Sequence, residues 1–172
     1  QVAAIITEPY QGNCGGIEAQ PGFMQFIRQK CDDYRIVFIL DEVKTGFRIA
    51  NGGAQEYFNI KPDLATYAKA MGNGYPIAAF GGKKEIMSII GHGVAQGGTY
   101  TNNKPGVAAA YATLSILKDQ PILKTIERRG KRLMIGLKSI FDKAGIQVVF
   151  SGLPAMFSFA FGVDEVSNQR NW

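Results

Sequence analysis

Two apolar segments separated by an amphipathic one constrain the fold of this chain most strongly. Residues 2–7 read VAAIIT and residues 35–41 read RIVFILD, short runs made mostly of branched, aromatic and small apolar side chains. Between them, residues 21–34 begin with a proline and place Phe23, Ile27 and other apolar residues at helical spacing. Because a strand that is apolar on both faces is typical of a parallel sheet covered by helices, these segments predict a strand–helix–strand unit.

The alternation of strands and helices continues along the chain. Strands are expected at residues 62–69 and 77–82, and helices at residues 103–119 and 122–145. Two alternating segments, IQVVFSG and MFSFAFG, then follow as strands. The pattern predicts an α/β large domain with a mostly parallel sheet over residues 1–145, and the start of a small α+β C-terminal domain over residues 146–172.

The composition restricts the class of partner. The chain has 172 residues, 46% hydrophobic and 19% charged, which fits a globular protein with one core and excludes a disordered tail. The net charge is +5, but the basic residues are scattered apart from ERRGKR at residues 127–132, which is typical of the solvated face of a helix. We therefore expect no binding to nucleic acid.

The two cysteines and the apolar runs give further expectations. Cys14 and Cys31 lack the spacing of a metal site, so we expect no metal and a reduced, cytoplasmic protein. No apolar run approaches the length that spans a bilayer, so we expect no membrane insertion. The first residues already lie in a strand-like run without Met, and we expect the chain to be a piece of a longer protein.

Ionisable residues stand where two of the expected strands end. Asp41 and Glu42 close one strand, and Lys69 closes another just before a glycine-rich turn. Ligands of parallel α/β sheets gather at the carboxyl ends of strands, so an acid and an amine would meet there. The acid could instead accept N–H groups of the next turn, and the lysine could be solvated. A lysine desolvated by small apolar neighbours has a lowered pKa and can form a Schiff base.

A third polar segment, GGTYTNNKP at residues 97–105, leads into an expected helix. Its hydroxyl and backbone N–H groups suit a phosphate, although a helix-capping motif is equally compatible. An acid, an amine nucleophile and a phosphate loop together suggest a phosphorylated aldehyde cofactor with a basic ring nitrogen.

Several motifs in this order resemble one enzyme family. DEVKTGFR at residues 41–48, followed by GGAQEYFNIKPDLATYAKAMGNGYPIAAFGG at residues 52–82, resembles the cofactor-binding core of the class III, fold-type-I aminotransferases. Within it the chain is most similar to the branch of the glutamate-1-semialdehyde 2,1-aminomutases, from EPYQGNCG through GGTYTNNKP to MFSFAF. The resemblance implies pyridoxal 5′-phosphate as cofactor. It also implies transfer of an amino group from an amino acid or amine to a keto or aldehyde acceptor, between molecules or within one.

The resemblance implies roles for four residues. Lys69 matches the lysine that holds the cofactor as a Schiff base and moves a proton, and Asp41 matches the carboxylate paired with the pyridinium nitrogen. Val43 matches the residue packed on one ring face, although core packing is equally compatible. Thr99 matches the hydroxyl that reaches the cofactor phosphate of the neighbouring subunit, which implies a homodimer with shared sites.

The chain also departs from the family pattern. Asn13 stands where relatives acting on ω-amino substrates carry a glutamate, and Lys44 stands where Gln or Met is common near the cofactor's phenolic oxygen. The family's Ser-Gly-Thr phosphate cup and second ring-stacking residue have no counterpart here, so we expect the segment alone to be inactive. The alternative is a catalytically silent fragment or partner domain that keeps the fold; the presence of both Asp41 and Lys69 argues against it.

Overall fold

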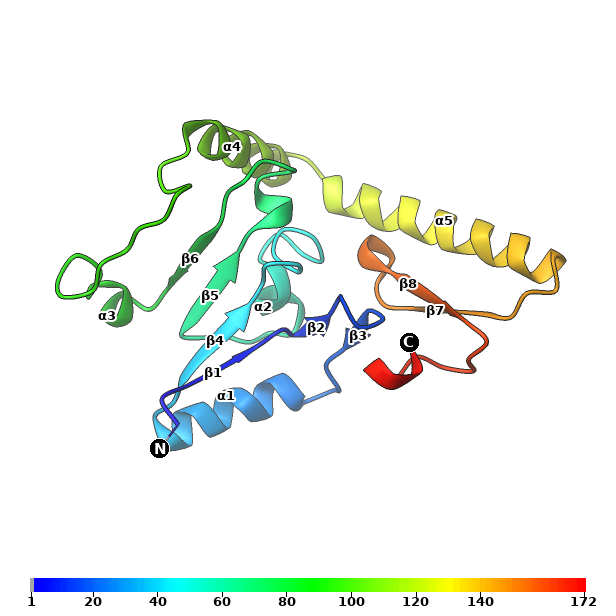
Figure 1. Cartoon of the computed structure of the whole chain (residues 1–172), viewed down its shortest axis with the longest axis horizontal. Helices are drawn as coiled ribbons and strands as arrows, with labels where there is room; N and C mark the ends of the chain where they lie inside the picture. Colours follow the sequence, from blue (N-terminus) through cyan, green and yellow to red (C-terminus); the bar gives the residue numbers. More distant parts are fainter. Residues whose placement is uncertain (1) are drawn as a thin grey trace. The chain divides into compact units, whose positions relative to one another are not determined.

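The computed structural model describes residues 2–172 (Figure 1). The chain divides into two compact units. The first comprises Gln1–Pro9 and Pro21–Asp119, and the second comprises Tyr10–Gln20 and Gln120–Trp172. The second unit thus combines a short segment from near the start of the chain with its C-terminal part.

A four-stranded sheet forms the centre of the first unit, in the order β1-β4-β5-β6 (Figure 1). Strands β1, β4 and β5 are parallel, and β6 is antiparallel to β5. The prediction of an α/β fold with a mostly parallel sheet is therefore confirmed. The strands are β1 (Ala4–Thr7), β4 (Val37–Asp41), β5 (Leu64–Tyr67) and β6 (Ala79–Gly82).

Helix α1 (Phe23–Tyr34) packs on β4 through an apolar face. Its Met24, Ile27 and Cys31 are buried, as the helical spacing predicts. Burial along β4 alternates: Phe38 and Leu40 are fully buried, whereas the residues between them are partly buried. The strand is thus less symmetric than its sequence indicates, because one face is covered more completely than the other.

The remaining helices of the first unit differ in how far the sequence predicted them. Helix α4 (Lys104–Asp119) matches the prediction, and its buried Gly106 and Ala110 allow close packing. A Cβ on Gly106 would lie 2.9 Å from the carbonyl oxygen of Pro76, so a larger side chain would push the helix away. Helices α2 (Gly53–Tyr57) and α3 (Lys84–Met87) were not predicted, because segments this short show no helical period.

The second unit contains helix α5 (Ile122–Lys143) and two small antiparallel pairs. These are β2 (Tyr10–Gln11) with β3 (Ile17–Glu18), and β7 (Val148–Ser151) with β8 (Ser158–Phe161). Phe141 of α5 lies on Phe159 and Phe161 of β8, with ring centroids 5.9 and 5.3 Å apart. The sequence pattern predicts this helix in a domain of residues 1–145 and a second domain from residue 146. In the structure α5 instead belongs to the same compact unit as β7 and β8.

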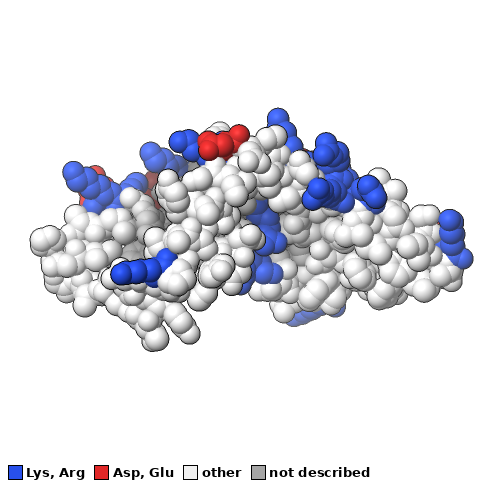
Figure 2. All heavy atoms as spheres, turned by 90° about the horizontal axis from the view of Figure 1, so that it is seen from above, with Lys and Arg blue, Asp and Glu red and all other residues white. Residues whose placement is uncertain are grey.

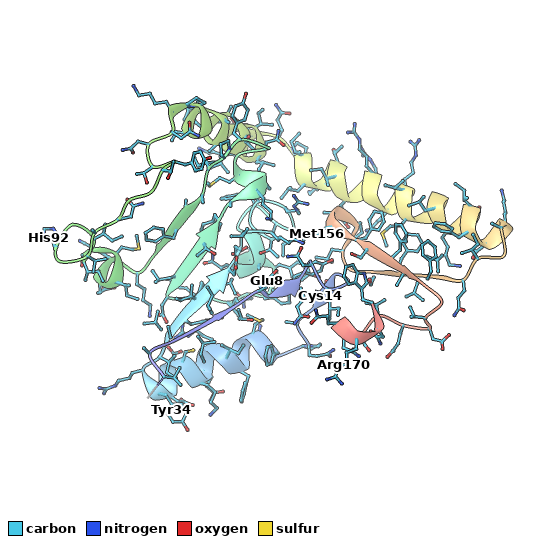
Figure 3. The ribbon with its side chains drawn as sticks, in the orientation of Figure 1. Glu8, Cys14, Tyr34, His92, Met156 and Arg170 are labelled. Atoms are coloured by element: carbon cyan, nitrogen blue, oxygen red, sulfur yellow. The ribbon has the colours of Figure 1, made fainter. Side chains whose placement is uncertain are left out.

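Buried Tyr10 joins the two ends of the second unit. Its hydroxyl donates to the carbonyl oxygen of Met156 at 2.8 Å and accepts from the N–H of Leu153 at 3.2 Å. Met156, which is labelled in Figure 3, belongs to the short turn Pro154–Met156. The segment around residue 10 therefore folds with the connection between β7 and β8, more than one hundred residues later in the chain.

Figure 2 shows Lys and Arg in several separate groups on the face that it draws, as the scattered sequence positions indicate. Among the helices of residues 2–172, none has the length and apolar character that crossing a membrane requires.

Candidate active site

The carboxyl ends of β4 and β5 lie next to each other. Asp41, the last residue of β4, is the register partner of Thr66 in β5, and the N–H of Glu42 donates to the carbonyl oxygen of Thr66 at 3.0 Å. Lys69 follows the end of β5 by two residues. The acid and the lysine that the sequence selects are thus placed at neighbouring strand ends of one sheet.

The Asp41 carboxylate is held by one of its oxygens. Its Oδ1 accepts from the N–H of Val43 at 2.9 Å and from the Oγ1 hydroxyl of Thr66 at 3.2 Å. No donor from the described residues bonds Oδ2. Because an ionised carboxylate can accept at both oxygens, Asp41 is oriented by the protein and can still accept from a cationic N–H donor.

Glu42 has a different role from its neighbour. Its side chain is fully buried and accepts from the Oγ1 of Thr45 at 3.1 Å and from the N–H of Ala54, the second residue of α2, at 2.6 Å. The Nε2 of Gln55 donates to it at 3.0 Å. Glu42 therefore takes the structural role of an acid that accepts backbone N–H groups, and fixes the loop between β4 and α2.

Lys69 stands at a strained position of the backbone. It opens a short 3₁₀ turn, Lys69–Met71, with φ 46°, a left-handed conformation that costs a side-chain-bearing residue about 1–2 kcal/mol. The N–H groups of Gly72 and Asn73 close the turn on its carbonyl oxygen at 3.1 and 3.0 Å. Lys69 is exposed, so the described residues do not supply the dry surroundings that its small apolar neighbours suggested.

A hollow of about 800 Å³ opens beside these strand ends. Val43, Thr66, Tyr67 and Thr99 lie among its lining residues, so the structure brings Val43 and the GGTYTNNKP loop around one space. Asp41 and Lys69 are not among the described residues that line it. Of the predicted residues, two share the hollow and two share the adjoining strand ends.

The single histidine of the sequence lies away from these strand ends. His92 is exposed in the loop that follows α3, at the outer end of the first unit (Figure 3). Among the residues that the structure describes, no imidazole therefore lies at the candidate site.

Gln55 and Tyr67 are two further polar residues of this region to which the sequence pattern assigns no role. Gln55 Nε2 also donates to the Tyr67 hydroxyl at 2.7 Å. Burial raises the pKa of the Tyr67 phenol and the charge of Glu42 adds to the effect, while the Gln55 hydrogen bond opposes it. No spacing in the sequence could indicate the contacts of Gln55 with Glu42 and Tyr67, because they join separate elements.

Lys44 is partly buried and has an interaction partner, so it does not point freely into solvent.

Comparison with known proteins places this chain in a family. The sequence pattern described as "Aminotransferase class-III" matches residues 1–169. The chain is 42% identical over 169 residues to the glutamate-1-semialdehyde 2,1-aminomutase of Methanobrevibacter smithii, covering 97% of this chain and 40% of that protein. It is 41% identical to the enzyme of the same name from Desulfatibacillum aliphaticivorans, covering 98% of this chain and 40% of that protein.

Solved structures agree with the sequence comparison. The fold matches the PLP internal aldimine form of the FumI protein of Sphingopyxis sp. MTA144, with a TM-score of 0.87, 28% identity, and coverage of 95% of this chain and 40% of that one. It also matches a β-phenylalanine aminotransferase from Variovorax paradoxus, with a TM-score of 0.84, 29% identity, and coverage of 99% and 40%. The chain thus spans about 40% of the length of the curated relatives it matches. With its α/β sheet and with Asp41 and Lys69 at adjoining strand ends, the chain belongs to the class III aminotransferases, a family whose cofactor is pyridoxal phosphate.

Proposed function

We propose that this chain carries the ring-nitrogen partner and the reactive lysine of a pyridoxal-phosphate enzyme. The enzyme would transfer an amino group from an amino acid or amine to a keto or aldehyde acceptor. The observation that carries the proposal is the Asp41 carboxylate, which two donors hold by Oδ1 while Oδ2 is left for an added cationic donor. Lys69 supplies an amine at the next strand end.

Asp41 acts on the ring nitrogen. Its negative charge favours the protonated nitrogen, and the fixed Oδ1 orients the carboxylate before the ring arrives. When bound, pyridoxal phosphate supplies an aldehyde that condenses with amines and a ring that accepts electrons from the reacting carbon. A fixed carboxylate maintains this electron-accepting character throughout the reaction.

Lys69 acts at its amino nitrogen. The amine would bind the cofactor covalently, release it when a substrate amine takes its place, and then carry a proton to and from the substrate carbon. The left-handed φ of Lys69 agrees with this role, because backbone strain of this kind clusters at functional sites.

Val43 and Thr99 complete the proposed contacts of this chain. Val43, part-buried at the hollow, would pack on one ring face, and the Thr99 hydroxyl would bind the phosphate of the cofactor in a second subunit. This assignment requires a homodimer with shared sites. The exposure of Thr99 in a loop supports it, because its hydroxyl is available to a partner.

An aminomutase of the glutamate-semialdehyde type is the specific reaction that we propose first. The two aminomutases share 42% and 41% identity with this chain, whereas the two solved structures reported above share 28% and 29%. Asn13 in place of a glutamate also disfavours ω-amino substrates. We further propose a reducing, cytoplasmic setting, which the free state of Cys14 and Cys31 supports.

The test is conversion of the bound cofactor by candidate amino donors. The purified full-length protein that contains this chain would be loaded with pyridoxal phosphate and mixed with glutamate 1-semialdehyde, β-phenylalanine or ornithine while its absorbance is followed. We expect conversion to the amino form of the cofactor with the semialdehyde. Asp41→Asn should slow this conversion about 100-fold or more, since it removes a charge that stabilises the transition state. Conversion at an unchanged rate in Asp41→Asn would contradict the proposal.

A further inference from the structure

The side chain of Gln55 connects the two strand ends that carry Asp41 and Lys69. We propose that Gln55 is a positioning residue, whose bridge between Glu42 and Tyr67 sets the placement of Asp41 relative to Lys69. The inference rests on the proposed function.

A single nitrogen atom donates both hydrogen bonds of the bridge. Gln55 Nε2 donates to the Oε1 of Glu42 at 3.0 Å and to the hydroxyl oxygen of Tyr67 at 2.7 Å. A primary amide has two N–H groups, one for each partner, and the Glu42 carboxylate can only accept. The carboxylate therefore determines which end of the amide faces inward.

The two partners of Gln55 are themselves fixed. Glu42 is fully buried and also accepts from Thr45 and from the N–H of Ala54. The Tyr67 ring packs on Phe47 at 5.5 Å between centroids, and it lies so close to Gly46 that a Cβ there would come within 2.8 Å of it. Because both partners are fixed, the Gln55 bridge constrains the position of Glu42 relative to Tyr67 and does not follow a mobile side chain.

The Gln55 bridge lies just beyond the last backbone pair of β4 and β5. Pairing between β4 and β5 ends with Asp41 and Thr66, apart from the bond between the Glu42 N–H and the Thr66 carbonyl oxygen. Beyond this pair one chain turns toward α2 and the other enters the 3₁₀ turn of Lys69. Gln55 joins the residue after Asp41 to the residue two positions before Lys69, where the backbone ladder has stopped.

The test compares Gln55→Met with Gln25→Met in the purified full-length protein that contains this chain. Gln25 is a matched control because its Nε2 is also a hydrogen-bond donor, but through a single bond, to the carbonyl oxygen of Phe58 at 2.6 Å, from the exposed face of α1. Three quantities would be measured: the dissociation constant of pyridoxal phosphate, the pH midpoint of the bound cofactor's absorbance, and the thermal midpoint of the cofactor-free protein.

Positioning predicts a specific pattern of results. Gln55→Met should weaken cofactor binding about three- to tenfold, the effect of one or two net hydrogen bonds, and should move the absorbance midpoint toward that of Asp41→Asn. Gln25→Met should leave the dissociation constant of the cofactor within about twofold of that of the original protein and should leave the pH midpoint of the absorbance unchanged. Tyr67→Phe keeps the ring and should reproduce part of the loss of cofactor affinity. The double variant Gln55→Met/Tyr67→Phe should bind the cofactor no more weakly than Gln55→Met alone, because the two substitutions remove the same bridge.

Two results would overturn the inference, and they can be told apart. If the unsubstituted protein binds cofactor on Lys69 and Gln55→Met changes only the thermal midpoint, Gln55 has a structural role and the positioning inference alone fails. If the unsubstituted protein binds no cofactor, the proposed function fails and the inference fails with it.

Discussion

Asp63 is predicted to be the most important single charge for the stability of the sheet. Its carboxylate is 5% exposed and lies just before β5. It accepts from the N–H of Phe38 at 2.7 Å and from Nη1 of Arg28 at 3.0 Å, and it pairs with Nζ of Lys83 at 2.5 Å. One side chain therefore ties α1, β4 and the residue that follows β6 to the start of β5.

The cost of Asp63→Asn follows from what each partner loses. Removing one member of a buried ion pair costs about 3–5 kcal/mol when the other is left without compensation. Here Arg28 keeps its pair with Asp32, and Lys83 is half-exposed and can be hydrated. An asparagine oxygen can still accept from Phe38. We therefore expect a loss of about 2–3 kcal/mol, at or below the low end of that range.

Hydrogen exchange of the purified protein, followed by mass spectrometry, measures this loss. Peptides covering α1 and β4 should exchange about 30- to 150-fold faster in Asp63→Asn, as a loss of about 2–3 kcal/mol requires. Asp32→Asn is the matched control, because it removes a carboxylate that also pairs with Arg28 but is 63% exposed; it should cost about 0.5 kcal/mol or less. Equal exchange rates in Asp63→Asn and Asp32→Asn would contradict the predicted contribution of Asp63 to stability.

The same carboxylate gives a pH dependence. Burial alone would raise the pKa of Asp63, but hydrogen bonds from Lys83, the Phe38 N–H and Arg28 outweigh it, so its pKa lies below the ordinary value. A group whose pKa is depressed by folding stabilises the fold above its unfolded pKa of about 3.9 and loses this contribution as pH falls further. The difference between the original protein and Asp63→Asn should therefore be full at neutral pH and shrink below about pH 4.

Substitutions at four further positions test separate features of the loops. Gly53→Ala should destabilise by about 2–4 kcal/mol in chemical denaturation, because φ is +66° and its Cβ would lie 2.1 Å from Oε2 of Glu42. Gly145→Ala, at φ +67° in open space, should show only the backbone part of this cost. Lys69→Gly should leave the cofactor-free protein about 1 kcal/mol more stable than Lys69→Ala; equal unfolding midpoints would contradict the left-handed turn. Lys44→Met should change the absorbance spectrum of the bound cofactor, and an unchanged spectrum excludes a tuning role for Lys44.

The sequence predicted those parts of the fold that depend on local pattern. The spacing of apolar residues gave α1 and β4, and the rule that carboxyl ends of parallel strands meet gave Asp41 and Lys69 as neighbours. Helix α2 escaped because it is five residues long and begins at glycines. Its position is set by Glu42, more than ten residues earlier in the chain.

Contacts between elements account for the rest of what the sequence did not predict. The partner of α5 could not be read from its amphipathic pattern, which shows that a face is apolar but not which strands cover it. The Gln55 bridge depends on two loops meeting in space, and neither glutamine nor tyrosine at those positions is unusual in itself. The exposure of Lys69 differs from what its small neighbours suggested, since burial depends on elements distant in sequence.

Borohydride reduction of the purified, cofactor-loaded full-length protein, followed by peptide mass mapping, identifies the lysine that binds the cofactor. Reduction converts a reversible bond between lysine and the cofactor aldehyde into a stable phosphopyridoxyl group. We predict this group on Lys69, and its loss in Lys69→Ala. An unmodified Lys69, or modification of Lys44 instead, would contradict the assignment of the reactive amine to the end of β5.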